Sequence, residues 1–236
     1  MICLIIPALN EEEPIGDVVR SVPNGVVDQV VVVDNGSTDR TCERAREAGA
    51  LVITEPRRGY GRACRTGVDL ALEIGAEVIA FMDGDGSDCP EFMHQIVSPI
   101  LFDGYDFVIG SRTRGKREKG SLNLQQLCAG RLAGVLLRAL YGVRYTDMSP
   151  FRAIRAELLK TLHMQEESYG WNLEMQMRVA ARGARILEIP VDHRMRRGGE
   201  SKVSGTLKGT VIAGLRILMT FFQVAADHSE SMPRSI

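Results

Sequence analysis

Two aspartates placed for metal chemistry, Asp83 and Asp85, stand one residue apart directly after the apolar run 76–81. Carboxylate oxygens at this spacing can hold a hard divalent cation, and such cations bind diphosphates. The interleaved Gly84 and Gly86 leave room for a backbone and a bulky ligand to approach closely. A solvated Asp/Gly turn is the alternative interpretation. The position of the pair after a buried strand, where open α/β sheets bind their ligands, favours the metal–diphosphate site.

Three further segments end an apolar run and begin a loop or a helix. They read Pro-Ala-Leu-Asn-Glu-Glu at 7–12, Asp-Asn-Gly-Ser-Thr-Asp-Arg-Thr at 34–41 and Arg-Arg-Gly-Tyr-Gly-Arg-Ala at 57–63. Each can be explained by capping and turn chemistry alone. Pro7 cannot donate to a sheet ladder and is expected to end its strand. All three segments converge on the sheet edge that carries Asp83 and Asp85, which favours a shared binding site.

Short apolar runs alternate with helical patterns over residues 1–110. Strands are expected at 2–6, 29–33, 50–54, 77–82 and 106–109, and helices at 12–21, 39–48, 61–74 and 90–101. Continuous Val/Ile/Leu strands separated by helices of this length indicate a parallel sheet that is covered on both faces. The sequence therefore predicts an α/β fold in which the carboxyl ends of the strands bring the polar segments together.

The bulk composition narrows the class of protein. The chain has 236 residues, of which 44% are hydrophobic and 25% charged, and its net charge is −1. These values are typical of a soluble globular protein, and the charge balance does not indicate nucleic acid as a partner. Five widely spaced cysteines without a Cys-x-x-Cys pair indicate free thiols in a reducing compartment rather than a disulfide framework or a zinc site. The sequence shows no basic-then-apolar leader, so a cytoplasmic location is expected.

The ordered motifs carry a resemblance to a known family. They lie at 7–11, 33–39, 59–61 and 82–85, and they continue through 110–112, 149–153, 169–171 and 198–202. The set resembles that of the family 2 glycosyltransferases, and within them the dolichyl-phosphate mannose and polyprenyl-phosphate glucose synthases. The resemblance implies a GT-A fold, a nucleotide-diphosphate sugar donor, a Mg²⁺ or Mn²⁺ cofactor, and inversion at the transferred sugar carbon.

The resemblance also implies roles for individual residues. Asp83 and Asp85 would be the metal ligands at the catalytic centre, and Asp34 or its neighbour would read the base. The nucleotide-sugar site would comprise Pro7, Ala8, Asn10, Glu11, Asp34, Asn35, Gly36, Gly59, Gly61, Asp83, Gly84 and Asp85. Many relatives have Asp at the position of Asn35. Some have a further metal ligand at the position of Ser87, for which Asp88 is a candidate substitute.

Two arginine-rich loops in the second half indicate contact with phosphate. Residues 112–120 hold five basic side chains against one acid, and residues 194–202 hold four more. Arg112, Arg197 and Lys202 are the strongest candidates, because Arg makes bidentate phosphate contacts and Lys acts as a point charge. Arg152, in the motif 149–153, is a further candidate. Glycines in both loops would let them close over the donor. Two solvated charged loops are the alternative.

The chemistry of the acceptor decides whether a catalytic base is needed. A lipid phosphate is already anionic near neutral pH, so positioning and charge stabilisation would suffice. A hydroxyl acceptor would require a carboxylate to take its proton. Glu174 and Asp147 are the candidates for that role, and each could instead be a structural acid that pairs with a nearby arginine.

The boundaries expected from these patterns are a GT-A domain at 1–204 and an amphipathic helix with a tail at 205–236. Residues 1–110 would form the nucleotide-sugar half, and 111–204 the acceptor half. The apolar faces of the helices expected at 122–141 and 207–226 favour packing on the domain, with membrane contact or homodimerisation as alternatives.

The function expected from the sequence is transfer of a hexose from a nucleotide-diphosphate sugar to a polyprenyl phosphate, with transient contact at the cytoplasmic membrane face. Transfer to a hydroxyl of a lipid, small molecule or saccharide is the alternative reaction. A non-catalytic nucleotide-sugar sensor is the alternative from another class of protein, and the presence of both Asp83 and Asp85 argues against it.

Overall fold

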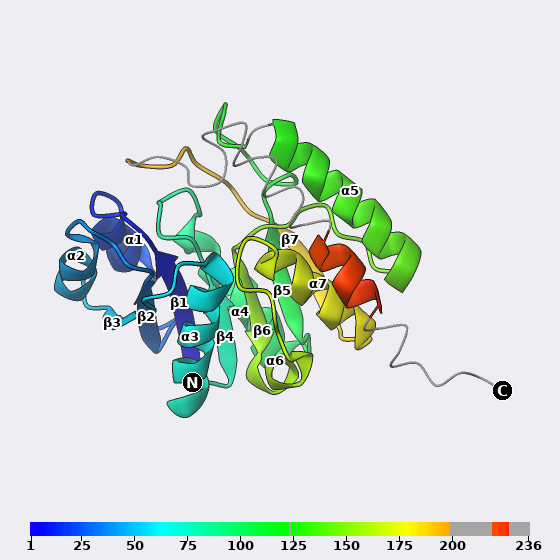
Figure 1. The fold of residues 1–236 in the computed structure, drawn as a ribbon, viewed down its shortest axis with the longest axis horizontal. Helices are drawn as coiled ribbons and strands as arrows, with labels where there is room; N and C mark the ends of the chain where they lie inside the picture. Colours follow the sequence, from blue (N-terminus) through cyan, green and yellow to red (C-terminus); the bar gives the residue numbers. More distant parts are fainter. Residues whose placement is uncertain (123, 199–218, 227–236) are drawn as a thin grey trace.

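One mixed β-sheet organises the chain (Figure 1). The computed structural model describes residues 1–122, 124–198 and 219–226. In this part, seven strands pair in the order β3-β2-β1-β4-β6-β5-β7. The strands are β1 (Ile2–Ala8), β2 (Gln29–Asp34), β3 (Leu51–Thr54), β4 (Val78–Phe81), β5 (Phe107–Ser111), β6 (Arg152–Arg155) and β7 (Ile186–Pro190). The labelled helices are α1 (Ile15–Ser21), α2 (Thr41–Glu47), α3 (Tyr60–Glu73), α4 (Met93–Phe102), α5 (Leu124–Tyr141), α6 (Ala156–Leu162) and α7 (Trp171–Ala181).

The expected α/β alternation is confirmed for the first half of the chain. β1 pairs in parallel with β2 and β4, and β2 pairs in parallel with β3. β6 runs antiparallel to both β4 and β5, so the sheet is mixed rather than purely parallel. Helices separate the parallel strands because a parallel pair needs a long crossover connection.

The expected end of the first strand is wrong by two residues. β1 continues through Pro7 to Ala8, and Pro7 lies opposite Val33 of β2. On its other side β1 pairs with β4 only as far as Ile5. Pro7 is tolerated in this central strand because β4 has already ended beside it.

Two apolar layers cover the sheet. One layer contains side chains of α1, α2 and α4, and the other contains side chains of α3, α5, α6 and α7. Trp171 lies in the second layer and is 1% exposed, so it packs in the core. This double cover explains the continuous apolar strands of the sequence, which would otherwise expose one face to water.

The two expected amphipathic helices have different outcomes. α5 is present, and its Ala133 and Leu137 belong to the second apolar layer. Of the segment 207–226, only the helical residues 219–226 are described, and Phe221 and Val224 pack in that same layer. In Figure 1 this short helix lies beside α7. Across the described residues, no helix is long and apolar enough to cross a membrane.

Candidate active site

The carboxyl ends of β1, β2 and β4 border a cavity of about 580 Å³. The parallel registers place these ends at one edge of the sheet, as the sequence predicts. The side walls come from the start of α3, from α5 and from the start of α7. The predicted residues that line the cavity are Pro7, Ala8, Glu11, Asn35, Gly59, Asp83, Gly84, Asp85, Arg112 and Asp147. The cavity therefore brings the two aspartates together with an acceptor-side arginine.

Several other predicted residues do not line this cavity. They are Asn10, Asp34, Gly36, Gly61, Arg152, Glu174 and Arg197. Lys202 lies outside the described residues. The local contacts of these side chains, described below, give the physical reasons.

Asp34 does not line the cavity, whereas its neighbour Asn35 does, so of the two candidates for reading the base only Asn35 faces the cavity. Its carboxylate accepts hydrogen bonds from the backbone N–H groups of Gly36 at 3.2 Å and Ser37 at 3.0 Å, and its residue is only 4% exposed. Asn10 also serves the loops, because its side-chain oxygen accepts a bond from the N–H of Thr38 at 2.8 Å. Both residues stabilise the loops at the strand ends, so they affect the cavity indirectly, through the conformation of those loops.

Asn35 has a role that an aspartate could not fill. Its side-chain NH₂ donates to the carbonyl oxygens of Glu55 at 2.9 Å and Arg57 at 2.8 Å, and its Oδ1 accepts from the N–H of Gly59 at 2.8 Å. A carboxylate has no donor for the two carbonyls. The Asn at this position therefore fixes the loop that leads into α3.

The two glycines of the 59–61 segment make room for protein, not only for a ligand. A Cβ on Gly59 or Gly61 would lie 2.3 Å from the carbonyl oxygen of Glu167 or Glu166, respectively. Gly59 also has φ of 148°, a conformation that favours glycine. The N-terminus of α3 is thus packed against the loop that precedes α7, which corrects the expected nucleotide contact of Gly61.

The end of β4 concentrates negative charge. Asp83 accepts a bond from the Tyr60 hydroxyl at 3.2 Å, and its backbone N–H donates to Asp88 at 3.0 Å. Asp85 Oδ1 accepts from the N–H of Ser87 at 3.0 Å and from its hydroxyl at 2.7 Å. Burial, followed by the charges of Asp88 and Asp85, raises the pKa of Asp83 well above its usual range. A bound cation would relieve this repulsion.

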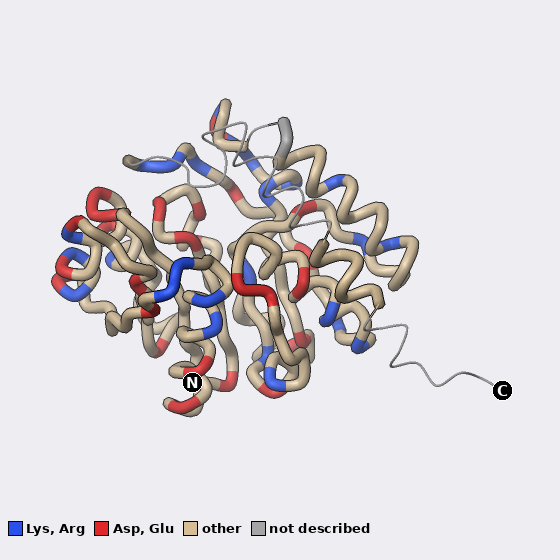
Figure 2. Tube along the Cα trace, in the orientation of Figure 1, with Lys and Arg blue, Asp and Glu red and all other residues tan. Residues whose placement is uncertain are grey.

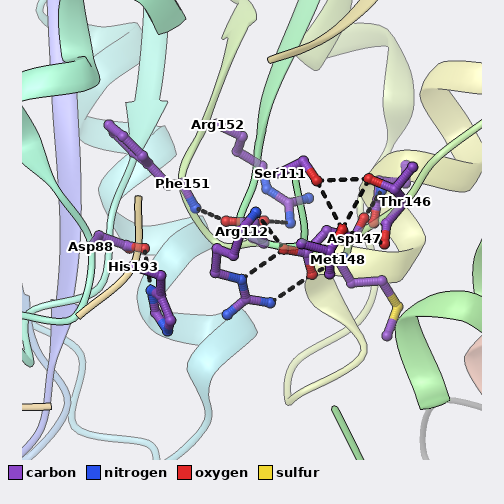
Figure 3. Close-up of polar contacts among 12 residues, drawn as sticks. Asp88, Ser111, Arg112, Thr146, Asp147, Met148, Phe151, Arg152 and His193 are labelled. Carbon is purple, nitrogen blue, oxygen red and sulfur yellow. Dashed lines mark hydrogen bonds and ion pairs between the residues drawn. The ribbon is translucent and has the colours of Figure 1, made fainter. Parts of the chain in front are cut away.

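His193 adds a second indication of a cation beside the aspartates (Figure 3). Its Nδ1 lies 3.8 Å from Asp88 Oδ1, and neither atom has a hydrogen-bond partner among the described residues. Burial lowers the pKa of His193 to about 4, so the imidazole is neutral near pH 7. A neutral imidazole and a carboxylate are both metal ligands. The donor set at this edge therefore fits a divalent cation.

The protein side chains do not complete a coordination shell by themselves. Within the described ranges, no group of three or more His, Cys, Asp or Glu side chains is gathered closely enough to hold a metal ion. A cation held here would need further oxygen ligands, such as those of a diphosphate.

Arg196 lies close to Asp85, whereas the sequence favoured its neighbour Arg197 as the candidate. Its guanidinium forms an ion pair with Glu11, and its Nη1 lies 3.4 Å from Asp85 Oδ2. Arg197 instead donates its backbone N–H to the carbonyl oxygen of Asp85 at 2.9 Å, and its side chain does not line the cavity. The segment that follows β7 thus lies along the Asp-x-Asp loop. Of these two arginines, Arg196 lines the cavity and Arg197 does not, and the phosphate contact of Arg197 stays a prediction.

Arg112 and Asp147 form a buried, bidentate ion pair on the acceptor side (Figure 3). Arg112 donates Nε to Asp147 Oδ2 and Nη2 to Oδ1, both at 2.8 Å, and its backbone N–H also reaches Oδ2 at 2.9 Å. Burial would raise the pKa of Asp147, but the Arg112 charge and these hydrogen bonds hold it below its usual value. Both carboxylate oxygens are therefore engaged in positioning Arg112.

Arg152 is buried among protein groups and does not line the cavity. The residue is 0% exposed, and its guanidinium donates to the carbonyl oxygens of Ser149 and Asn172. It also lies over the Phe107 ring, with 5.9 Å from Cζ to the ring centroid. Burial lowers the pKa of Arg152 to about 10, so it stays charged near pH 7.

Glu174 anchors the loop that precedes α7. It is 2% exposed and accepts bonds from the N–H groups of Gln165 at 2.9 Å and Glu166 at 2.7 Å, and from Arg178 Nε at 2.8 Å. These contacts direct its carboxylate to the protein backbone and away from the cavity lining.

Replacing Glu174 with Gln should therefore loosen this loop. The substitution keeps the size of the side chain but removes the buried carboxylate charge that pairs with Arg178, so we expect the free energy of unfolding to fall by about 3 kcal/mol. Backbone amides of 163–170 should exchange faster in hydrogen-exchange mass spectrometry. Glu157→Gln, which removes an exposed partner of Lys160, is the matched control and should change little. Unchanged exchange in 163–170 would contradict the anchoring role.

Comparisons with known proteins show which family this sequence is similar to. The sequence model of "Glycosyl transferase family 2" matches residues 3–162. An uncharacterised glycosyltransferase of Mycobacterium tuberculosis is 36% identical over 216 residues, covering 90% of this chain and 94% of that protein. A dolichyl-phosphate hexose transferase of Haloferax volcanii is 34% identical over 216 residues, covering 89% and 90%. An undecaprenyl-phosphate mannosyltransferase of Micrococcus luteus is 31% identical over 225 residues, also covering 89% and 90%.

Solved structures extend the comparison to the fold. The crystal structure of glucosyl-3-phosphoglycerate synthase from Mycobacterium tuberculosis, in complex with Mn²⁺, UDP and phosphoglyceric acid, aligns with a TM-score of 0.75. The alignment covers 100% of this chain and 80% of that one at 24% identity. At this identity the likeness establishes the architecture of the sheet and its helices.

Proposed function

Because the chain belongs to glycosyl transferase family 2 and is a glycosyltransferase with the GT-A fold, we propose that it transfers a hexose to a polyprenyl phosphate. The donor is a nucleotide-diphosphate sugar of the UDP-glucose or GDP-mannose type, and the sugar carbon is inverted. The reaction takes place at the cytoplasmic face of a membrane, which the protein contacts transiently.

This proposal rests on how the carboxylates around the cavity are paired. Among the described residues that line it, the acids are Glu11, Asp83, Asp85 and Asp147. Glu11 pairs with Arg196, and Asp147 pairs with Arg112 through both oxygens. Asp83 and Asp85 are the candidate metal ligands. Within the described lining of the cavity, no acid is thus left to take a proton from the acceptor, which favours an acceptor whose oxygen is already anionic.

The cofactor in this proposal is Mg²⁺ or Mn²⁺, held by Asp83 and Asp85 with neutral His193 as a neighbouring ligand candidate. When bound, the ion would neutralise the charge of the departing nucleoside diphosphate. The solved glucosyl-3-phosphoglycerate synthase complexes with Mn²⁺ or Mg²⁺ and UDP support this choice of cofactor and donor class.

The residues of the chain position the two anions for reaction. The acceptor phosphate oxygen attacks the anomeric carbon and forms the new C–O bond, while the bond from that carbon to the diphosphate breaks. The nucleoside diphosphate leaves with the electron pair, and no proton moves. Arg112, held by Asp147, places its fixed charge where the acceptor phosphate arrives, and Arg196 places another beside Asp85.

The names of similar proteins support the acceptor class. The dolichyl-phosphate hexose transferase and the undecaprenyl-phosphate mannosyltransferase both act on polyprenyl phosphates, and each aligns over 89% of this chain.

The proposal is tested by offering the purified protein labelled UDP-glucose and GDP-mannose, Mn²⁺ and a short polyprenyl phosphate. We expect one label to enter an organic phase as a product that mild acid hydrolyses, because a sugar phosphate ester is acid-labile. An acid-stable lipid product would overturn the phosphate acceptor in favour of a hydroxyl. Donor binding without any turnover would overturn the enzyme in favour of a sensor.

A further inference from the structure

α5 is apolar on two sides, and only one side is covered by protein. Ala133 and Leu137 pack in the second apolar layer. On the outward side Leu132, Val135 and Leu140 are 54%, 66% and 51% exposed. Singly exposed apolar residues need no explanation, but three on one side of one helix form a surface that favours an apolar contact. We call these three residues the α5 face.

The charged residues on α5 and just beyond its end are all basic. Arg131 and Arg138 are exposed on the same helix, and Arg144 is exposed just beyond its end. The sequence has no acidic residue between Lys119 and Asp147. Figure 2 shows this distribution, with basic but no acidic segments on α5. An apolar strip flanked by arginines, with no acid nearby, complements an anionic lipid surface.

The α5 face is also continuous with the acceptor side of the cavity. Gln126 and Ala129, in the first two turns of α5, line the cavity together with Arg112 and Met148. Leu132 follows Ala129 by three residues, which is less than one helical turn. A molecule that enters the cavity beside α5 therefore passes the end of this face.

We propose that the α5 face docks on an anionic bilayer, with Leu132, Val135 and Leu140 among the headgroups and the flanking arginines against lipid phosphates. The surface holds the cavity mouth at the membrane, where a polyprenyl phosphate presents its headgroup. The lipid nature of the acceptor rests on the proposed function, but the docking itself does not require the acceptor.

A second copy of the chain fits this face less well. In a two-fold contact, α5 would face α5, and the arginines of one copy would approach those of the other with no acid on either helix to pair with them. A stable dimer also needs about 1,200 Å² or more of buried surface, which three side chains on one helix do not supply.

The test is flotation of the full-length protein with vesicles that contain no polyprenyl phosphate. Vesicles of phosphatidylcholine alone are compared with vesicles enriched in phosphatidylglycerol, at low and high salt. We expect binding to the anionic vesicles and weaker binding at high salt. The double variant Leu132→Ser/Val135→Ser should weaken binding by about tenfold because less apolar surface enters the interface. Arg131→Gln/Arg138→Gln should weaken it by about thirtyfold, since each basic residue near the surface contributes about 1 kcal/mol and two are removed.

Phe102→Ser is the matched control, because Phe102 is 78% exposed at the end of α4, a helix of the other apolar layer. It should leave vesicle binding unchanged. All variants should keep the thermal unfolding and the UDP–Mn²⁺ affinity of the parent, because none of the substituted residues lines the cavity.

Other outcomes would overturn the docking surface. Absence of vesicle binding, or equal binding of parent and variants, would do so. A dimer in sedimentation analysis that Leu132→Ser/Val135→Ser dissociates would assign the face to a second copy. Vesicle binding without any lipid-linked product would overturn the proposed acceptor but not the docking surface. Formation of lipid-linked product without α5-dependent vesicle binding would overturn the docking surface but not the proposed acceptor.

Discussion

Replacing Asp85 with Asn is expected to reduce sugar transfer by about a thousandfold, equivalent to roughly 4 kcal/mol of transition-state stabilisation. The amide keeps the size of the side chain and can still accept from Ser87, but it loses the charge that would bind the metal. Metal-dependent UDP binding, measured by calorimetry with and without Mn²⁺, should be lost. The fold should not suffer, because the substitution removes one of the charges that repel Asp83.

Asp103→Asn is the control for this variant, since Asp103 is exposed in the turn after α4 and does not line the cavity. It should transfer sugar at the parent rate. If Asp85→Asn retained Mn²⁺-dependent UDP binding at the parent affinity, the assignment of Asp85 as a metal ligand would be wrong.

Replacing Asp147 with Asn should destabilise the protein by about 3 kcal/mol, because it leaves the Arg112 guanidinium buried without a counterion. The side chains of this pair are only 11% and 5% exposed, so solvent screens the lost attraction weakly. The free energy of unfolding, measured by urea titration, reports the loss. Asp147→Glu, which keeps the charge, should recover part of it.

Asp147→Asn should also change how the free energy of unfolding depends on pH in the acidic range. The pKa of Asp147 is lower in the folded than in the unfolded state. Its contribution to the free energy of unfolding is therefore complete above the unfolded-state pKa of about 3.9, and it declines as the pH falls through the lower folded-state pKa. The difference in unfolding free energy between parent and Asp147→Asn should therefore shrink as the pH is lowered through that range. A difference that grows with acidity would contradict the ion pair.

Kinetics of this variant separate positioning from base catalysis. With Asp147 acting through Arg112, we expect KM for the acceptor to rise and the shape of the pH–rate profile to persist. A normal KM with a large loss of kcat, and the disappearance of an acidic limb in the profile, would instead identify Asp147 as a base.

The sequence alone was sufficient to place a polar residue where that residue directly follows a recognisable strand. Asp83 and Asp85 follow an apolar strand directly, so the end of β4 places them at the ligand edge whatever the details of the loops. It was insufficient where a side chain has competing partners. Asp34 and Arg152 are residue types that bind ligands, but nearby backbone groups satisfy them first, and the sequence does not encode that competition in a readable pattern.

The sequence alone also could not predict which residues make contact between segments that are far apart in the chain. Arg196 and His193 reach the Asp-x-Asp loop from beyond β7, and their register on that loop depends on how the whole sheet is ordered. The expected parallel pattern did not include β6, whose antiparallel pairing with β4 and β5 joins the second half of the chain to the first. The arginine-rich composition of 194–202 was the available signal, and it identified the segment but not the residue.

The close packing of Gly59 and Gly61 against the carbonyl oxygens of Glu167 and Glu166 has a mechanical consequence. It holds the start of α3 against the loop that precedes α7 through backbone contacts, without a side chain between them. A side chain larger than hydrogen at either position would push these two segments apart and change the width of the cavity between them.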